Sequence, residues 1–277
     1  MTVVIPGTTI CCVDCSAYDL AARALAVSMA QCRFEHAILF TDRPMDVVGV
    51  EVRLIPAIAS TADYSQFLLK ELRHHITTEF VLVTQWDGYV IDGREWRPDF
   101  QTYDYIGARW PHVPGIEVGN GGFSLRSRRL LEACGDERFV VSHPEDAAIC
   151  VSNRHFLERE KGIRFAPPEL AERFSFERTR DGGPHFGFHG LFNLPFVMAD
   201  EELPGFVAVM PARIAWMGEL FEALLAYMAT GRVREARTIW HWMTRHRPEA
   251  EMVSFMRQHV RPLDACENII AALTAAG

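Results

Sequence analysis

The segment Glu79–Thr84 most limits what this chain can fold into, because EFVLVT is an apolar run of strand length. Such a run is typical of a central parallel strand that is buried on both faces. Similar strand-like and helix-like segments alternate before it along the chain: Thr8–Val13, Ala17–Gln31, His36–Thr41, Val50–Ile55 and Tyr64–His75. Strands that alternate with helices at short spacing predict a doubly wound α/β layer.

The pattern continues in shorter pieces after residue 100. Strands are expected at Tyr103–Ala108 and Gly121–Leu125, and helices at Arg126–Cys134 and Glu145–Arg159, while His185–His189 closes the domain. These pieces complete an α/β domain that we expect to span residues 1–205, followed by a helical extension over residues 206–277.

Two helices are expected in the extension, Ile214–Ala229 and Val233–His246, separated by Gly231. Their pattern resembles a tetratricopeptide-type helical hairpin, and a single hairpin cannot bury its own apolar face. The surplus apolar side chains are Leu220, Leu224, Leu225, Met228, Ile239, Trp240 and Met243. We expect them to pack on the preceding domain, the alternative being a homodimer or carrier-protein surface.

Composition limits the partners and the compartment. The formal net charge of −8 argues against a general binder of nucleic acid or anionic membranes. The first residues lack the basic start of a signal peptide, and no apolar run approaches the ~20 residues of a membrane span. The seven cysteines include no pair of CxxC knuckles, so we expect reduced thiols in a cytoplasmic protein without a membrane span.

The tetrapeptide Gln85-Trp86-Asp87-Gly88 follows directly on the EFVLVT strand. Asp87 is therefore expected at the carboxyl end of a strand, where open α/β sheets bind ligands. Its carboxylate suits the hard divalent cation that a diphosphate needs, and Gly88 lets the backbone approach a ligand closely. The alternative is an Asp-Gly turn between two strands, because the apolar pattern resumes at residue 90.

The segment VGNGGFS, residues 118–124, contains three glycines in four positions. Asn120, Gly121 and Gly122 would permit unusual backbone angles and close contact with a sugar or phosphate. A plain turn that leads into a strand explains the same residues.

Two further motifs contain ionisable side chains. In SHPED, residues 142–146, Ser142 and Glu145 fit a capping box, which leaves Asp146 as either a general base or an acidic residue of the first helical turn. In FGFHG, residues 186–190, His189 is framed by glycines and aromatic residues. It is either a metal ligand or a structural histidine.

In this order the four motifs resemble those of the GT-A glycosyltransferase superfamily. The resemblance is strongest to a bacterial family catalogued as a domain of unknown function, with hallmarks similar to QWDG, GNGGFS, PED and FGFHG. It covers roughly Thr8–Pro195. It implies a GT-A-like (Rossmann-like) mixed sheet flanked by helices, and an enzyme that transfers a sugar from a UDP-sugar or another NDP-sugar to an acceptor hydroxyl.

The resemblance also implies roles for single residues. GT-A enzymes end a central strand with Asp-x-Asp, whose second Asp binds Mn²⁺ or Mg²⁺; here Asp87 matches it and Gln85 replaces the first. His189 matches the late histidine that commonly completes the metal shell. Asp14 and Asp42 are similar to positions that hold the nucleotide's base and ribose.

Animal β-galactosyltransferase families carry a similar Gly-Gly strand, then a helix, then Glu-Asp. By this resemblance Asp146 is the base of an inverting transfer, and Glu145 contacts the acceptor or caps its helix. Trp86 and the glycine loop would line the sugar and the acceptor. Phosphate contacts are expected from Lys70, Arg109 or Arg126.

Alternative functions stay open at this point. Retaining chemistry is compatible with the same motifs. A nucleotidyltransferase needs a Gly-rich, Arg-containing loop after the first strand, whereas CVDCSAYD has no glycine. A non-catalytic nucleotide- or protein-binding module would use the C-terminal helices instead. The acceptor is a glycan, a small molecule or a protein.

Overall fold

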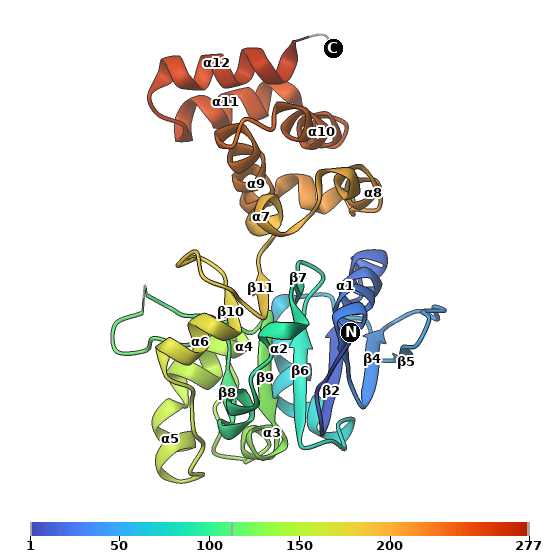
Figure 1. Cartoon of the computed structure of the whole chain (residues 1–277), viewed down its shortest axis with the longest axis vertical. Helices are drawn as coiled ribbons and strands as arrows, with labels where there is room; N and C mark the ends of the chain where they lie inside the picture. The colour runs from blue at the N-terminus through green and yellow to red at the C-terminus, as the bar shows by residue number, and fades with distance from the viewer. Residues whose placement is uncertain (1, 112, 276–277) are drawn as a thin grey trace. The chain divides into compact units, whose positions relative to one another are not determined.

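The computed structural model describes residues 2–111 and 113–275 (Figure 1). The chain divides into two compact units, of which the first ends at His189 and the second begins at Gly190. The boundary expected after residue 205 lies instead inside helix α8 (Leu203–Ala208) of the second unit. The division comes earlier because the short helices α7 (Leu194–Val197) and α8 contact the long helices that follow them.

The first unit contains a six-stranded sheet in the order β5-β4-β2-β6-β9-β8. Strands β2, β4, β5 and β6 are parallel, whereas β9 is antiparallel to both β6 and β8. The strands are β2 (Thr8–Val13), β4 (His36–Thr41), β5 (Glu51–Leu54), β6 (Phe80–Thr84), β8 (Tyr105–Ile106) and β9 (Phe123–Ser127). The expected mixed α/β sheet flanked by helices is confirmed.

Two smaller sheets complete this unit. Strands β1 (Val3–Val4) and β3 (Cys32–Arg33) form a parallel pair. In the other sheet, β11 (Gly187–His189) lies between β10 (Ser175–Phe176) and β7 (Gly88–Val90), parallel to the first and antiparallel to the second. This three-stranded sheet brings together chain segments about a hundred residues apart.

Helices cover both faces of the main sheet. Helix α1 (Tyr18–Gln31) contacts β2 and β4. A buried cluster of strand and helix side chains lies on the other face, since alternate residues of a strand point to opposite sides. Its members include Cys11, Val13, Phe40, Val81, Val83, Phe67, Leu72 and Leu131 of α3 (Arg128–Cys134).

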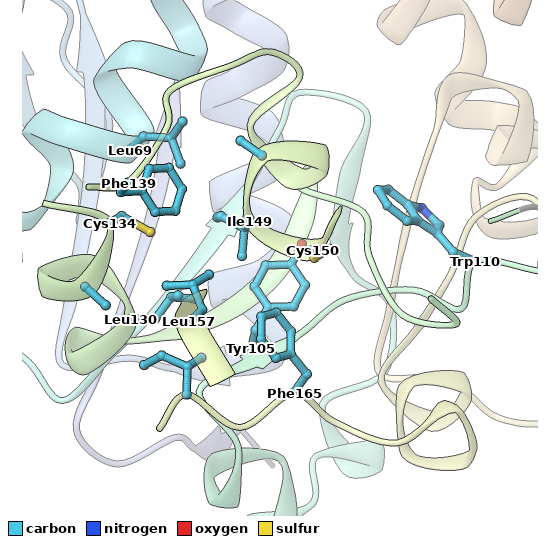
Figure 2. Packing of buried hydrophobic residues seen from close by; sticks show 13 residues of the cluster. Leu69, Tyr105, Trp110, Leu130, Cys134, Phe139, Ile149, Cys150, Leu157 and Phe165 are labelled. Carbon is cyan, nitrogen blue, oxygen red and sulfur yellow. The ribbon is translucent and has the colours of Figure 1, made fainter. Parts of the chain in front are cut away.

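A second buried cluster surrounds Tyr105 (Figure 2). The rings of Tyr105 and Phe165 lie 5.8 Å apart between centroids, and Leu157 of α5 (Arg154–Arg159) packs in the same cluster. The Tyr105 hydroxyl donates to the carbonyl oxygen of Asn120 at 2.9 Å. The cluster therefore anchors the glycine-rich loop to the interior.

Two helices that the sequence predicts as continuous are broken. Residues 61–74 form α2 (Thr61–Gln66), a π-helical turn and a 3₁₀ turn. Residues 145–159 form α4 (Glu145–Ala147), the π-helical turn Ala148–Ser152 and α5. A short helix α6 (Pro168–Phe174) precedes β10.

The second unit is helical. Helices α9 (Gly218–Ala229) and α10 (Val233–Thr244) form the expected pair, and α11 (Glu249–His259) and α12 (Leu263–Thr274) were not expected. Helix α10 contacts α8, α9 and α12, so the surplus apolar side chains of the pair have partners within their own unit. Buried side chains include Leu220, Leu224, Tyr227, Ile239, Trp240, Met243, Met252 and Leu273.

All seven cysteines are free thiols, six of them buried and Cys15 half-buried. Across residues 2–111 and 113–275, none of the helices has both the length and the apolar character needed to cross a bilayer.

Candidate functional site

Strand pairing brings three of the four sequence motifs to one edge of the main sheet. Strand β6 ends at Thr84, which is paired with Phe123 at the start of antiparallel β9. The amide of Gln85 donates to the carbonyl oxygen of Gly122 at 2.8 Å. In the small sheet, Gly88 pairs with His189. QWDG, the glycine loop and FGFHG therefore lie together at the carboxyl end of β6.

The imidazole of His189 is surrounded by four polar side chains, and we call these five residues the His189 cluster. Its Nε2 lies 3.1 Å from Gln85 Oε1 and 3.4 Å from Asp87 Oδ1. Its Nδ1 lies 3.3 Å from Glu177 Oε1 and 3.1 Å from Asn120 Nδ2. Burial lowers the pKa of His189, but the carboxylates of Asp87 and Glu177 outweigh it and hold that pKa well above its ordinary value.

Asp87 is 4% exposed, and its Oδ1 accepts no hydrogen bond from the described part of the chain. Leaving a buried acceptor unsatisfied costs about 1–3 kcal/mol, more when the group is charged. A carboxylate oxygen and an amide oxygen here both lie near an imidazole nitrogen, and such a donor set could hold Mn²⁺ or Mg²⁺. Within residues 2–111 and 113–275, His, Cys, Asp and Glu alone form no metal-binding group of three. The set thus depends on the amide of Gln85.

The two consecutive glycines of the loop each make room for a side chain from elsewhere. A Cβ on Gly122 would lie 2.1 Å from His189 Nε2, and a Cβ on Gly121 would lie 2.0 Å from Glu145 Oε1. Asn120 before them adopts a φ of 70°, which asparagine tolerates better than most residues, and its Oδ1 accepts from the amide of Phe123 at 3.1 Å. The loop is shaped by close packing.

Behind this loop lies a buried ion pair between Arg126 and Glu145. Arg126 Nη2 is 3.0 Å from Glu145 Oε1, with side chains that are 0% and 5% exposed. The guanidinium also donates to Ser124 Oγ at 3.0 Å and to the carbonyl oxygen of Gly121 at 3.3 Å. Burial raises the pKa of Glu145 while Arg126 opposes that rise. The pair fixes the loop from the inside.

Two sequence predictions about these residues are wrong, the capping box and the start of helix α3. The capping box of Ser142 and Glu145 is wrong, since the residue at the helix start is Pro144 and no side chain caps the helix. The carboxylate of Glu145 neutralises a buried guanidinium instead. Arg126, one of the residues expected to contact phosphate, is fully buried, and Lys70 donates to the carbonyl oxygens of Cys134 and Asp136. Helix α3 begins only at residue 128, because Arg126 lies within β9.

Asp146 lies beside the glycine loop. Its Oδ2 accepts from the amide of Gly121 at 3.0 Å, and its Oδ1 accepts from the amide of Ala147 at 2.8 Å. The side chain is half-buried, unlike that of Glu145. The structure therefore brings Asp146 of the SHPED motif to the glycine loop, beside which the QWDG and FGFHG motifs also lie.

Asp14 and Asp42 follow β2 and β4, at the same edge as Asp87 because these strands are parallel neighbours of one sheet. Asp14 Oδ1 accepts from the amide of Ser16 at 2.6 Å, and the exposed Asp42 accepts from the Tyr18 hydroxyl at 3.0 Å. The Trp86 ring is 7% exposed, so it lies mostly in the interior.

Glu177 was not predicted from the sequence. It lies in ERTRDGGP, which indicates only a flexible polar loop. It reaches the His189 cluster because β10, which ends one residue earlier, pairs with β11 over only two residues. A strand of two residues cannot be distinguished from a loop by its sequence pattern.

The chain was compared with protein families, curated proteins and solved structures. A family model described as "Protein of unknown function (DUF5672)" matches residues 49–189, just over half of the chain, and its match ends where the first unit ends. No curated protein matches the sequence. Among solved structures, the apo-form glycosyltransferase GlyE of Streptococcus pneumoniae TIGR4 is similar with a TM-score of 0.40 and 11% identity. The alignment covers 66% of this chain and 54% of that one, so this chain spans about half of GlyE.

Proposed function

We propose that this chain, which belongs to the DUF5672 family, is a metal-dependent glycosyltransferase with a GT-A-like first unit. It would transfer a sugar from a nucleoside diphosphate donor to an acceptor hydroxyl. The observation that carries the proposal is the meeting of Gln85 Oε1, Asp87 Oδ1 and His189 Nε2 at the carboxyl edge of the sheet, beside the loop that contacts Asp146.

Asp87, His189 and Gln85 would hold Mn²⁺ or Mg²⁺. Oδ1 of Asp87 accepts no hydrogen bond from the described residues and lies 3.4 Å from His189 Nε2, which supports a cation as an additional partner of this carboxylate. A bound divalent cation would supply positive charge against the diphosphate and so stabilise it as a leaving group. Gln85 would thus contribute a neutral oxygen ligand.

Asp146 would act as the general base of an inverting transfer. The acceptor oxygen forms a bond to the anomeric carbon while the bond from that carbon to the diphosphate oxygen breaks. The proton of the acceptor hydroxyl would pass to Asp146. The amide of Gly121 donates to this carboxylate at 3.0 Å and so orients it. Glu145 does not compete for this role, because its carboxylate is buried against Arg126.

Asp14 and Asp42 would hold the nucleotide's base and ribose. Their place after β2 and β4 puts them on the edge that carries Asp87. The donor would be a UDP-sugar or another NDP-sugar, and the acceptor a glycan, a small molecule or a protein. Asn120, Gly121 and Gly122 would contact the sugar from the loop, beside Trp86.

A thermal-shift panel of nucleoside diphosphates and NDP-sugars, with and without Mn²⁺, tests the proposal. A ligand that binds only the native state raises the free energy of unfolding by RT ln(1 + [L]/Kd), and the melting temperature rises as a result. We expect at least one nucleotide to stabilise the protein only when Mn²⁺ is present. The protein should then hydrolyse the NDP-sugar of that nucleotide slowly, and it should transfer the sugar faster when an acceptor is added. A panel without any Mn²⁺-dependent stabilisation would refute the function.

A further inference from the structure

We propose that Glu177 is a positioning residue that keeps a proton on Nδ1 of His189 and so directs Nε2 toward the cation. The inference rests on the proposed function. Strands β10 and β11 are parallel, with Ser175 paired with Gly187 and Phe176 paired with Phe188. The next step of this register places Glu177 beside His189, where Oε1 lies 3.3 Å from Nδ1.

Two groups compete for Nδ1 of His189. The amide nitrogen of Asn120 lies 3.1 Å away, and it faces the ring because Asn120 Oδ1 accepts from the amide of Phe123. If that amide donated to Nδ1, a neutral ring would carry its proton on Nε2 and could not bind a cation there. If Nδ1 donates to Glu177, Nε2 is left for the cation.

Hydrogen-bond strength favours Glu177. A bond to a carboxylate is roughly twice as strong as one between neutral groups. Glu177 is 18% exposed at its side chain, and its Oε1 lies 3.3 Å from Nδ1 of His189. The carboxylate of Glu177 is therefore the stronger partner for Nδ1, and we expect it to outcompete the amide of Asn120.

The other side of the ring fits the same assignment. Nε2 faces two oxygens, Gln85 Oε1 at 3.1 Å and Asp87 Oδ1 at 3.4 Å. Both oxygens are acceptors, so a proton or a cation at Nε2 satisfies them, whereas a bare lone pair does not. A carboxylate behind a ligating histidine fixes its tautomer and raises its basicity, and its removal typically weakens metal binding by about 10–100-fold.

Mn²⁺ titration of matched variants tests the inference. Glu177→Ala should weaken Mn²⁺ binding about 10–100-fold. Glu177→Gln should weaken it less, because the amide oxygen still accepts from Nδ1. The control Glu169→Ala removes an exposed carboxylate of the same unit and should leave Mn²⁺ affinity unchanged. Equal affinities for Glu177→Ala and Glu169→Ala would overturn the inference.

Imidazole ¹⁵N NMR of the wild-type protein supplies a test that does not depend on any variant folding. With Mg²⁺ bound, Nδ1 of His189 should retain its proton while the Nε2 resonance shifts. A proton on Nε2 in that state would overturn the inference. If wild-type protein binds neither cation, the metal-dependent function fails. The metal-free spectrum then tests the role of Glu177 separately. The inference requires a downfield Nδ1 proton of His189 that is shielded from water, and its absence would overturn the inference.

Discussion

Gly88 and His189 are paired directly across the antiparallel strands β7 and β11. A Cβ on Gly88 would lie 2.8 Å from the carbonyl oxygen of Phe188 and 3.4 Å from His189 Cδ2. The histidine ring can therefore lie against the backbone that follows Asp87. The pairing of β7 with β11 therefore sets the distance between the side chains of Asp87 and His189. A site that is held by paired strands is more rigid than one on a free loop.

Asp146→Asn should retain nucleotide binding and lose most transfer activity. Removal of a general base typically costs about 10²–10⁴ in rate, while an Asn oxygen can still accept from the amide of Gly121. Turnover and nucleotide affinity should be measured on the same preparation. A parallel loss of nucleotide affinity would instead make Asp146 a donor contact.

Asp87→Asn should abolish the part of the thermal stabilisation by nucleotide that depends on Mn²⁺. The substitution keeps the shape of the side chain but removes the charge that a cation at Nε2 of His189 would face. The exposed Asp46 offers a control of equal charge, and Asp46→Asn should respond to Mn²⁺ as wild type does. An unchanged response in Asp87→Asn would exclude this carboxylate as a ligand.

Gly122→Ala should lower the melting temperature and weaken Mn²⁺ binding together. The added methyl would lie 2.1 Å from His189 Nε2, and overpacking of this kind costs about 1–3 kcal/mol. Gly218→Ala is the matched control, because its added Cβ would have no atom within 4 Å beyond its chain neighbours and the backbone of its own helix. That control should be neutral or slightly stabilising, since alanine is the better helix former. Equal melting temperatures for the two variants would contradict the close packing.

The sequence predicted the elements whose signal is local. The run Phe80–Val83 is apolar, so the strand and the position of Asp87 just after its end followed from the pattern alone. Contacts between distant segments were missed. The capping box of Ser142 and Glu145 satisfied every local rule, but a helix cap contributes only about 1 kcal/mol. Leaving the buried guanidinium of Arg126 without its partner costs about 3–5 kcal/mol, so the ion pair prevails.

Cys15 should be the first thiol to react with a disulfide reagent in the folded protein. Burial raises the pKa of Cys11 and of Cys134 to about 12; it also raises the pKa of Cys15, but that thiol is only half-buried and a reagent can reach it. Only thiolates react, so buried thiols of high pKa should react only after the protein unfolds. Cys15→Ser should remove the fast phase. Because Cys15 follows Asp14, bound nucleotide with Mn²⁺ should slow the reaction, and a rate that ignores nucleotide would argue against a nucleotide site there.

A chain that ends after Pro211 should aggregate or melt earlier than one that ends after Gly190. The first cut leaves α7 and α8 without the helices α9 and α10 that they contact, which uncovers Leu203 and Phe206. The second cut follows the division between the two units. Light scattering and thermal melting of both chains check this. If the chain ending after Pro211 is the better behaved, the boundary has been placed wrongly.

The two loop glycines impose a constraint on how this family can change over time. The space where a side chain at Gly121 would extend is already filled by Glu145, and that at Gly122 is filled by His189. A replacement at either glycine forces the present partner to shift at a cost in stability, so an evolutionary path that alters the partner first avoids this cost. Changing Glu145 first would leave Arg126 as an uncompensated buried charge. Gly121, Glu145 and Arg126 are therefore expected to be exchanged as a set or inherited together.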